Sequence, residues 1–244
     1  MLVEQTLEKM RLMKLNKMAQ SLETRISRAD HQDLTAAEFI GFLVDDEFIH
    51  RQNLRYQTRL RRASFKENTA CLENIDYKLD RDLKKKTILE LSQNHWIRNF
   101  QNIVITGPTG TGKSYLAQSL GNHAVKEGFS VAYIRCPKLY ENLRVSKADG
   151  SYLKKLKSLA KTNVLILDDF GVTTIDDEKR QDLFELIEDR QGIGSTVVTT
   201  QMPTEMWHKY LGGGQLGDSI CDRVLRNAHK LKLKGPSNRP EIKD

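Results

Sequence analysis

The sequence contains no apolar run approaching the roughly 18 residues that a membrane-spanning helix needs. It begins Met1-Leu2-Val3-Glu4-Gln5, so an acidic residue precedes any apolar stretch and no secretory leader is expected. Its three cysteines lie far apart and match neither the CxxC spacing of a metal site nor a paired disulfide framework. We therefore expect a cytoplasmic protein with reduced thiols and no membrane association.

Internal repeats and low-complexity tracts are also missing, and the six histidines have no metal-site or catalytic-triad spacing. What the chain does have is 244 residues with 39% hydrophobic content, enough for one mid-sized domain and a smaller one. The formal charge of +7 suits a polyanionic partner. These values indicate a globular protein in which the location of the basic residues matters more than their number.

Helical patterns fill the first part of the chain, and strand patterns begin only near residue 101. Apolar residues recur every three to five positions from Leu7 to Ile26, and Thr35-Ala36-Ala37-Glu38 has the form of a helix capping box. Later, β-branched runs alternate with helical patterns; they lie at 102–106, 131–134, 164–167 and 196–200. The sequence predicts a helical domain over 1–75 and an α/β domain with a parallel sheet over 76–244.

A glycine-rich segment after the first predicted strand matches the pattern GxxxxGK[ST]; it consists of Gly107, Pro108, Thr109, Gly110, Thr111, Gly112, Lys113 and Ser114. In such a loop the glycines let backbone N–H groups point at phosphates, and the following helix N-terminus adds positive potential. Lys113 would then reach the outer phosphates and Ser114 would bind Mg²⁺. A glycine-rich surface turn is the alternative, but the flanking strand and helix favour a nucleotide-binding loop.

An acidic pair follows the predicted strand at 164–167 directly. Asp168 would hold Mg²⁺, and Asp169 would orient and deprotonate the attacking water. The alternative is an ordinary solvated turn at the strand end. Because the pair comes after a phosphate loop and an intervening strand, the sequence favours a nucleotide hydrolase.

Two further positions are candidates for sensing the nucleotide. Thr200 or Gln201, at the end of the next predicted strand, would lie beside the loop and could sense the γ-phosphate, although such residues often only hydrogen-bond at a strand end. Arg223 and Arg226 lie three residues apart on a predicted helix, and one of them could act on a neighbouring subunit's nucleotide. The alternative for Arg226 is a surface ion pair with Asp222.

A one-sided basic segment lies near the end of the helical part. No acidic residue occurs between Phe48 and Lys66, and basic residues repeat every three or four positions: Arg51, Arg55, Arg59, Arg62 and Lys66. On a helix they would form one stripe, which predicts contact with DNA phosphates or with an acidic partner protein. A solvated helix face is the alternative.

In this order, the loop, the acidic pair, the polar strand end and the late arginine resemble the AAA+ ATPases, and among them the IstB-like transposition helpers related to DnaC helicase loaders. The resemblance covers residues 75–240 and is carried by the segments 75–77, 102–114, 165–171, 199–203 and 232–239. It implies ATP and Mg²⁺ as cofactors. It further implies that Tyr77 lies near the adenine, that Thr200 or Gln201 is the first sensor, that Arg223 is the arginine finger and that Arg239 is the second sensor.

The chain departs from the wider family in two ways. Asp169 stands where AAA+ proteins favour glutamate, one methylene longer, so we expect slow turnover. Only nine residues follow Gly235, too few for the usual C-terminal helical lid, which is therefore expected to be absent or truncated.

Together these features predict an ATP-hydrolysing switch that assembles as a homo-oligomer on duplex DNA, with ATP at its subunit interfaces. It would recruit or activate a transposase, and its N-terminal helices would supply assembly or partner contacts. A replicative helicase loader of the same fold is the first alternative. A DNA-binding scaffold that uses nucleotide only structurally is the second.

Overall fold

The computed structural model describes residues 2–28, 34–77 and 82–237 and divides the chain into two compact units, Met1–Thr58 and Arg59–Asp244. The first unit contains α1 (Leu2–Leu12), α2 (Asn16–Ser27) and most of α3 (Ala36–Ala63). Its small core joins the three helices; the buried members are Leu7, Ala19, Leu22 and Leu43.

Polar contacts fix the starts of α2 and α3 in the first unit. The predicted capping box forms before α3, since the Glu38 amide donates to Thr35 Oγ1 at 3.3 Å and the Thr35 amide donates to Glu38 Oε2 at 2.9 Å. The Glu47 carboxylate accepts the Lys17 and Met18 amides of α2 at 2.9 and 3.0 Å. Because these amides lack partners inside their own helix, a carboxylate from α3 replaces a cap from α2 itself.

The compact units divide within α3, whereas the sequence predicts a domain boundary at residue 75. The reason is that the chain after α3 packs onto α6 (Lys113–Lys126). The Glu67 amide donates to Gln118 Oε1 at 2.9 Å, and Asn122 Nδ2 donates to the Asn68 and Ala70 carbonyls at 3.1 and 2.8 Å. Residues 59–75 therefore pack with the nucleotide-binding fold.

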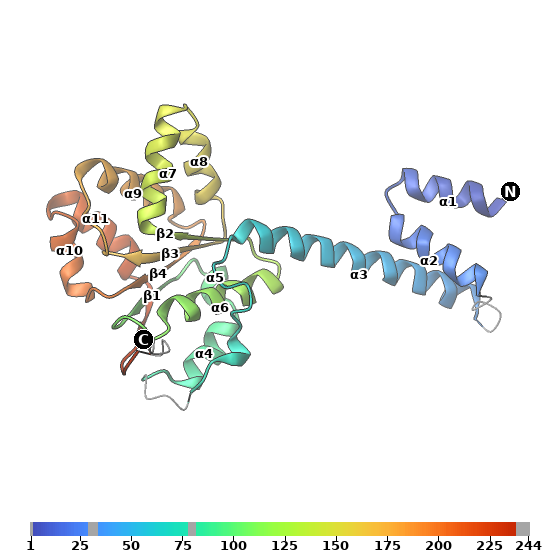
Figure 1. Ribbon diagram of the computed structural model, residues 1–244, viewed down its shortest axis with the longest axis horizontal. Coiled ribbons are helices and arrows are strands. Elements are labelled where there is room, and N and C mark those ends of the chain that lie inside the picture. Colours follow the sequence, from blue (N-terminus) through green and yellow to red (C-terminus); the bar gives the residue numbers. More distant parts are fainter. Residues whose placement is uncertain (1, 29–33, 78–81, 238–244) are drawn as a thin grey trace, which may run out of the picture. The chain divides into compact units, whose positions relative to one another are not determined.

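The second unit is built on a five-stranded sheet of order β2-β3-β4-β1-β5 in which every pair is parallel (Figure 1). Its strands are β1 (Asn102–Thr106), β2 (Val131–Arg135), β3 (Val164–Phe170), β4 (Ser195–Thr200) and β5 (Ala228–Lys232). The first four confirm the predicted strands. β5 was not predicted, because Ala-His-Lys-Leu-Lys contains no β-branched residue.

Helices cover both faces of this sheet (Figure 1). On one face, α6 packs against the central strands. On the other, Val104, Leu165, Leu167 and Val198 join the core formed with α7 (Cys136–Ala148), α9 (Asp177–Arg190) and α11 (Gly214–Leu225). The shorter elements are α4 (Lys85–Ser92), α5 (His95–Arg98), α8 (Tyr152–Ala160), α10 (Trp207–Tyr210) and two 3-10 turns at Leu72–Asn74 and Thr204–Met206.

This architecture confirms the predicted α/β class with a parallel sheet flanked by helices. Among the described residues, no helix is both long and apolar enough to cross a bilayer.

Candidate nucleotide-binding site

The phosphate loop connects the end of β1 to the start of α6, as predicted. Gly110 and Gly112 have φ values of +81° and +89°, which side chains rarely tolerate, so the two glycines allow the loop to turn. The Pro108 carbonyl accepts hydrogen bonds from Thr111 Oγ1 at 2.9 Å and from Lys113 Nζ at 2.6 Å. Lys113 is 9% exposed, so its side chain is packed against the loop.

The segment after β5 packs against the same loop. The Leu233 amide donates to the Thr106 carbonyl at 2.8 Å, and a Cβ atom added at Gly107 would lie 2.5 Å from the Leu233 carbonyl oxygen. A Cβ at Gly110 would collide with Ser237. Two glycines of the motif are therefore required by contact with residues 233–237, in addition to any contact with phosphate.

Asp168, near the end of β3, is 2% exposed and is held by three hydroxyl groups. Ser114 donates to Asp168 Oδ1 at 2.8 Å and Thr199 donates to the same oxygen, whereas Tyr133 donates to Oδ2 at 2.6 Å. Serine and carboxylate oxygens are the hard ligands that Mg²⁺ prefers, with water and phosphate completing its coordination. The pairing of Ser114 with Asp168 therefore fits the predicted magnesium site.

Asp169 lies in a β-bulge. Leu167 pairs with Val198 and Phe170 with Thr200, so β3 has one extra residue, and Asp169 has a φ of +58°. Its Oδ2 pairs with Arg135 Nε at 2.7 Å. Tyr133 and Arg135 are two residues apart on β2 and so share one face, which means that the bulge turns both carboxylates toward that face.

At the end of β4, the structure favours Thr199 over Thr200 as the residue nearest the acidic pair. Thr199 Oγ1 contacts Asp168 and also lies 3.2 Å from the Asp169 amide, which donates to it. Thr200, on the opposite face by strand alternation, donates to the Phe170 carbonyl at 2.7 Å and accepts from the Met202 amide at 3.0 Å. The hydroxyl of Thr200 is thus buried and hydrogen-bonded to backbone, and Gln201 is exposed; the role of either residue as a sensor stays a prediction.

Arg223 lies near the amino end of β1, whereas the phosphate loop lies at the carboxyl end of that strand. The Arg223 carbonyl accepts a hydrogen bond at 2.9 Å from Asn102, the first residue of β1. Its guanidinium forms an ion pair with Glu188 of α9 and donates to the side chain of Gln191, the residue after that helix, at 3.2 Å. Arg223 and the 80% exposed Arg226 line a cavity of about 330 Å³ with Arg190. Because a five-residue strand spans roughly 16 Å, neither arginine is placed to serve the loop of its own chain.

The basic stripe is only partly helical. Arg51, Arg55, Arg59 and Arg62 lie on α3, but the helix ends at Ala63 and Ser64 has a φ of +55°, so Lys66 lies beyond it. Arg51 is engaged by Glu47 Oε1 at 2.7 Å and by the Lys14 carbonyl at 3.0 Å, and Arg59 is partly buried. Arg55, Arg62 and Lys66 are exposed.

The two remaining predicted nucleotide contacts stay predictions. Tyr77 is partly buried, and burial raises the pKa of its hydroxyl. Arg239 lies outside the described residues.

Sequence reasoning missed Tyr133, Arg135 and Thr199, as well as the contact between residues 233–237 and the loop. A usable signal existed for the first two: a polar aromatic residue and an arginine alternate at the carboxyl end of a strand, where a parallel sheet places its functional groups. Nothing local in the sequence indicates the bulge at Asp169.

Comparison with known proteins agrees with this geometry. The chain is 38% identical over 204 residues to the ATP-binding protein of insertion sequence IS1162 from Pseudomonas fluorescens, covering 84% of this chain and 88% of that protein. It is 37% identical over 239 residues to the insertion-sequence ATP-binding protein y4pL of Sinorhizobium fredii, covering 98% and 97%.

Solved structures share the fold. The DnaC helicase loader superimposes with a TM-score of 0.54 at 22% identity, over 61% of this chain and 87% of that one. DnaI superimposes with a TM-score of 0.57 at 19% identity, over 70% and 91%. The sequence profile of the family described as IstB-like ATP binding protein matches residues 8–244. With its phosphate loop, acidic pair and parallel sheet in this order, the chain belongs to the IstB-like ATP-binding protein family, on an AAA+ fold.

Proposed function

We propose that this protein is an ATP-hydrolysing switch that assembles as a homo-oligomer on duplex DNA and recruits or activates a transposase. The observation that carries the proposal is the hydrogen bond between Ser114 of the phosphate loop and Asp168 of β3, on a chain whose relatives are named as ATP-binding proteins of insertion sequences. ATP and Mg²⁺ would be the cofactors.

Each residue of the site would have a separate task. Loop amides and Lys113 would bind the phosphates, and Ser114 and Asp168 would hold Mg²⁺, which neutralises charge on the β- and γ-oxygens. Asp169 would orient and deprotonate water after separating from Arg135, with which it now pairs. Thr199 would position Asp168 between the loop and the strand end.

The remaining features support assembly and DNA contact. Arg223 lies near the amino end of β1 and the phosphate loop at its carboxyl end, so Arg223 would act as an arginine finger on the nucleotide of an adjacent copy. The exposed members of the basic stripe, Arg55, Arg62 and Lys66, would contact DNA phosphates or an acidic surface of a partner.

Mass photometry of the full chain with duplex DNA tests this proposal. Wild-type protein with ATP and Mg²⁺ should form oligomers on DNA, whereas Lys113→Ala, which lacks the phosphate-binding ammonium, should remain dispersed. If Lys113→Ala assembles equally well without ATP, the protein is a scaffold and not a switch. Co-purification with a transposase, but not with a replicative helicase, would distinguish transposition from helicase loading.

A further inference from the structure

Tyr133 has no role in the predicted chemistry, yet its hydroxyl contacts the carboxylate at the centre of the site. We propose that Tyr133 is a positioning residue for the magnesium site: its hydroxyl fixes the orientation of Asp168 so that one carboxylate oxygen faces the phosphate loop. This inference rests on the proposed function of the site as a Mg²⁺·ATP site.

The two oxygens of Asp168 have different surroundings. Oδ1 accepts from Ser114 at 2.8 Å and from Thr199, so it is the oxygen that faces the loop. Oδ2 accepts from Tyr133 at 2.6 Å. When Ser114 turns its lone pair to a cation, it stops donating to Oδ1, whereas Tyr133 still donates to Oδ2. Thr199 also still donates to Oδ1, so Tyr133 at Oδ2 supplies the second bond, and the two hydroxyls together keep the carboxylate from rotating.

Because Asp168 is buried, loss of the hydrogen bond from Tyr133 would cost free energy. Asp168 is 2% exposed, so an oxygen without a donor would carry a desolvation cost. The Tyr133 ring is partly buried and packs against Phe65, with ring centroids 6.4 Å apart. A tyrosine hydroxyl with its ordinary pKa of about 10 is a hydrogen-bond donor at neutral pH.

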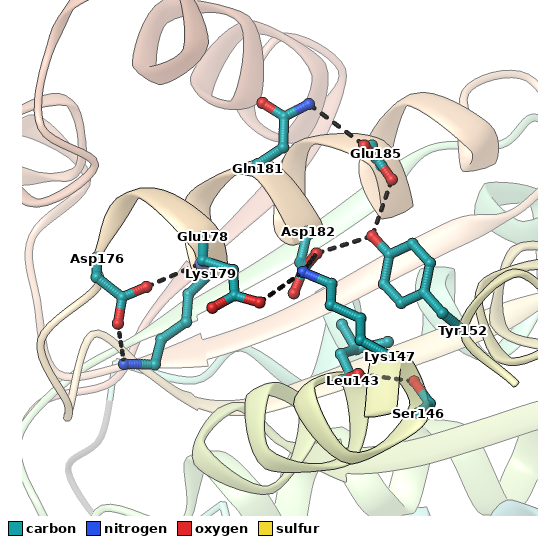
Figure 2. Close-up of polar contacts among 10 residues, drawn as sticks. All are labelled: Leu143, Ser146, Lys147, Tyr152, Asp176, Glu178, Lys179, Gln181, Asp182 and Glu185. Atoms are coloured by element: carbon teal, nitrogen blue, oxygen red, sulfur yellow. Dashed lines mark hydrogen bonds and ion pairs between the residues drawn. The ribbon is translucent and has the colours of Figure 1, made fainter. Parts of the chain in front are cut away.

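A second tyrosine provides a matched control. The Tyr152 hydroxyl lies 2.8 Å from both Asp182 Oδ1 and Glu185 Oε2, and its single proton is donated to one of these two carboxylates (Figure 2). Lys147 pairs with the same Asp182 Oδ1 at 2.7 Å (Figure 2). This cluster joins α7, α8 and α9, which cover the sheet face opposite α6, so it isolates the stability effect of losing a tyrosine hydroxyl.

The experiment compares Tyr133→Phe with Tyr152→Phe in the full chain. Binding of a fluorescent ATP analogue is measured by anisotropy while Mg²⁺ is titrated, with an EDTA series and a thermal melt for each variant. For Tyr133→Phe we expect the half-saturating Mg²⁺ concentration to rise roughly tenfold, as for other residues that orient metal ligands. Binding in EDTA should not change, and Tyr152→Phe should keep the wild-type Mg²⁺ curve even if its melting temperature falls.

The proposal is overturned if the Mg²⁺ curve of Tyr133→Phe superimposes on that of wild type, or if Tyr152→Phe shifts its curve equally. In either case a wild type that binds the analogue in a Mg²⁺-dependent manner leaves the proposed function standing. If wild-type protein does not bind the analogue at all, both the proposed function and this inference are wrong.

Discussion

At the scale of single residues, the backbone at Asp169 governs what the acidic pair can do. In a regular strand, consecutive side chains point to opposite faces, so Asp168 and Asp169 would be separated by the sheet. The extra residue in β3 and the positive φ of Asp169 remove that separation. A non-glycine residue in this conformation costs free energy, so the surrounding contacts of Arg135 and Thr199 must hold it.

The first prediction concerns Asp169. Replacing it with asparagine keeps the size of the side chain but removes the proton acceptor, so ATP hydrolysis should fall by about 10² to 10⁴. Nucleotide affinity should change little, because Lys113, Ser114 and Asp168 remain. Phosphate release and equilibrium ATP binding measure the two effects separately. Equal loss of both would mean that Asp169 supports the site's structure and not the reaction.

The second prediction concerns Glu47 and pH. Burial alone would raise the pKa of Glu47, but hydrogen bonds from Arg51 and from the Met18 and Lys17 amides outweigh it and lower the pKa below 4.5. A lowered pKa in the folded state means that the ionised form stabilises the first unit above about pH 4.5 and that this contribution disappears as pH falls further.

Glu47→Gln should therefore weaken α2 at neutral pH by about 1 to 3 kcal/mol, because it replaces a charged acceptor with a neutral one. Hydrogen exchange of the α2 amides in the full chain measures the change. The wild-type and variant rates should converge as the pH falls through the lowered pKa of Glu47; a constant difference at all pH values would contradict the assignment.

At the scale of elements, the contacts of two helical glycines should give opposite responses to the same substitution. Gly121 lies in α6, where an added Cβ would be 2.7 Å from Ile166 Cδ1 and 2.9 Å from Phe65 Cε1. Gly41 lies in α3, where an added Cβ meets nothing within 4 Å. Alanine favours a helix over glycine in both places, but only α6 is packed too tightly to accept the methyl group.

The third prediction follows. Gly41→Ala should stabilise α3 by about 0.5 to 1 kcal/mol, and Gly121→Ala should destabilise the second unit by about 1 to 3 kcal/mol. Chemical denaturation followed by circular dichroism measures both. Stabilisation by Gly121→Ala would show that Phe65 and Ile166 can move aside.

Much of the element order could be predicted because its signals are local. Each of β1 to β4 is a β-branched run, and Gly107 to Ser114 and Asp168-Asp169 are contiguous motifs. The rest depends on partners far along the chain. The contact of Thr199 with Asp168 depends on which face of β4 meets that carboxylate, and the packing of Leu233 on the loop depends on β5, whose composition gives no strand signal.

At the scale of the nucleotide-binding unit, the phosphate loop and Arg223 lie at opposite ends of the parallel strands, which we call the carboxyl edge and the amino edge of the sheet. The phosphate loop and acidic pair lie at the carboxyl edge, while Arg223 and the cavity that it lines lie at the amino edge. A complete site would then need the carboxyl edge of one copy and the amino edge of the next. Such a head-to-tail contact repeats, giving a ring or a helical filament, which suits assembly along DNA.

The last prediction tests that arrangement by mixing variants. Arg223→Ala removes the proposed arginine finger, and Asp169→Asn removes the proposed general base. Each variant alone should therefore hydrolyse ATP slowly, because an arginine finger raises the hydrolysis rate by about 10³ to 10⁵. In an equal mixture, about a quarter of the interfaces would join an intact Asp169 to an intact Arg223, and hydrolysis should recover to that fraction of wild type. Arg226→Ala is the control, because Arg226 has the same charge and lines the same cavity, but is exposed and pairs weakly with Asp222 at 3.7 Å. An unrecovered mixture would mean that the two residues do not meet across an interface, and a loss in Arg226→Ala alone would assign the finger to Arg226.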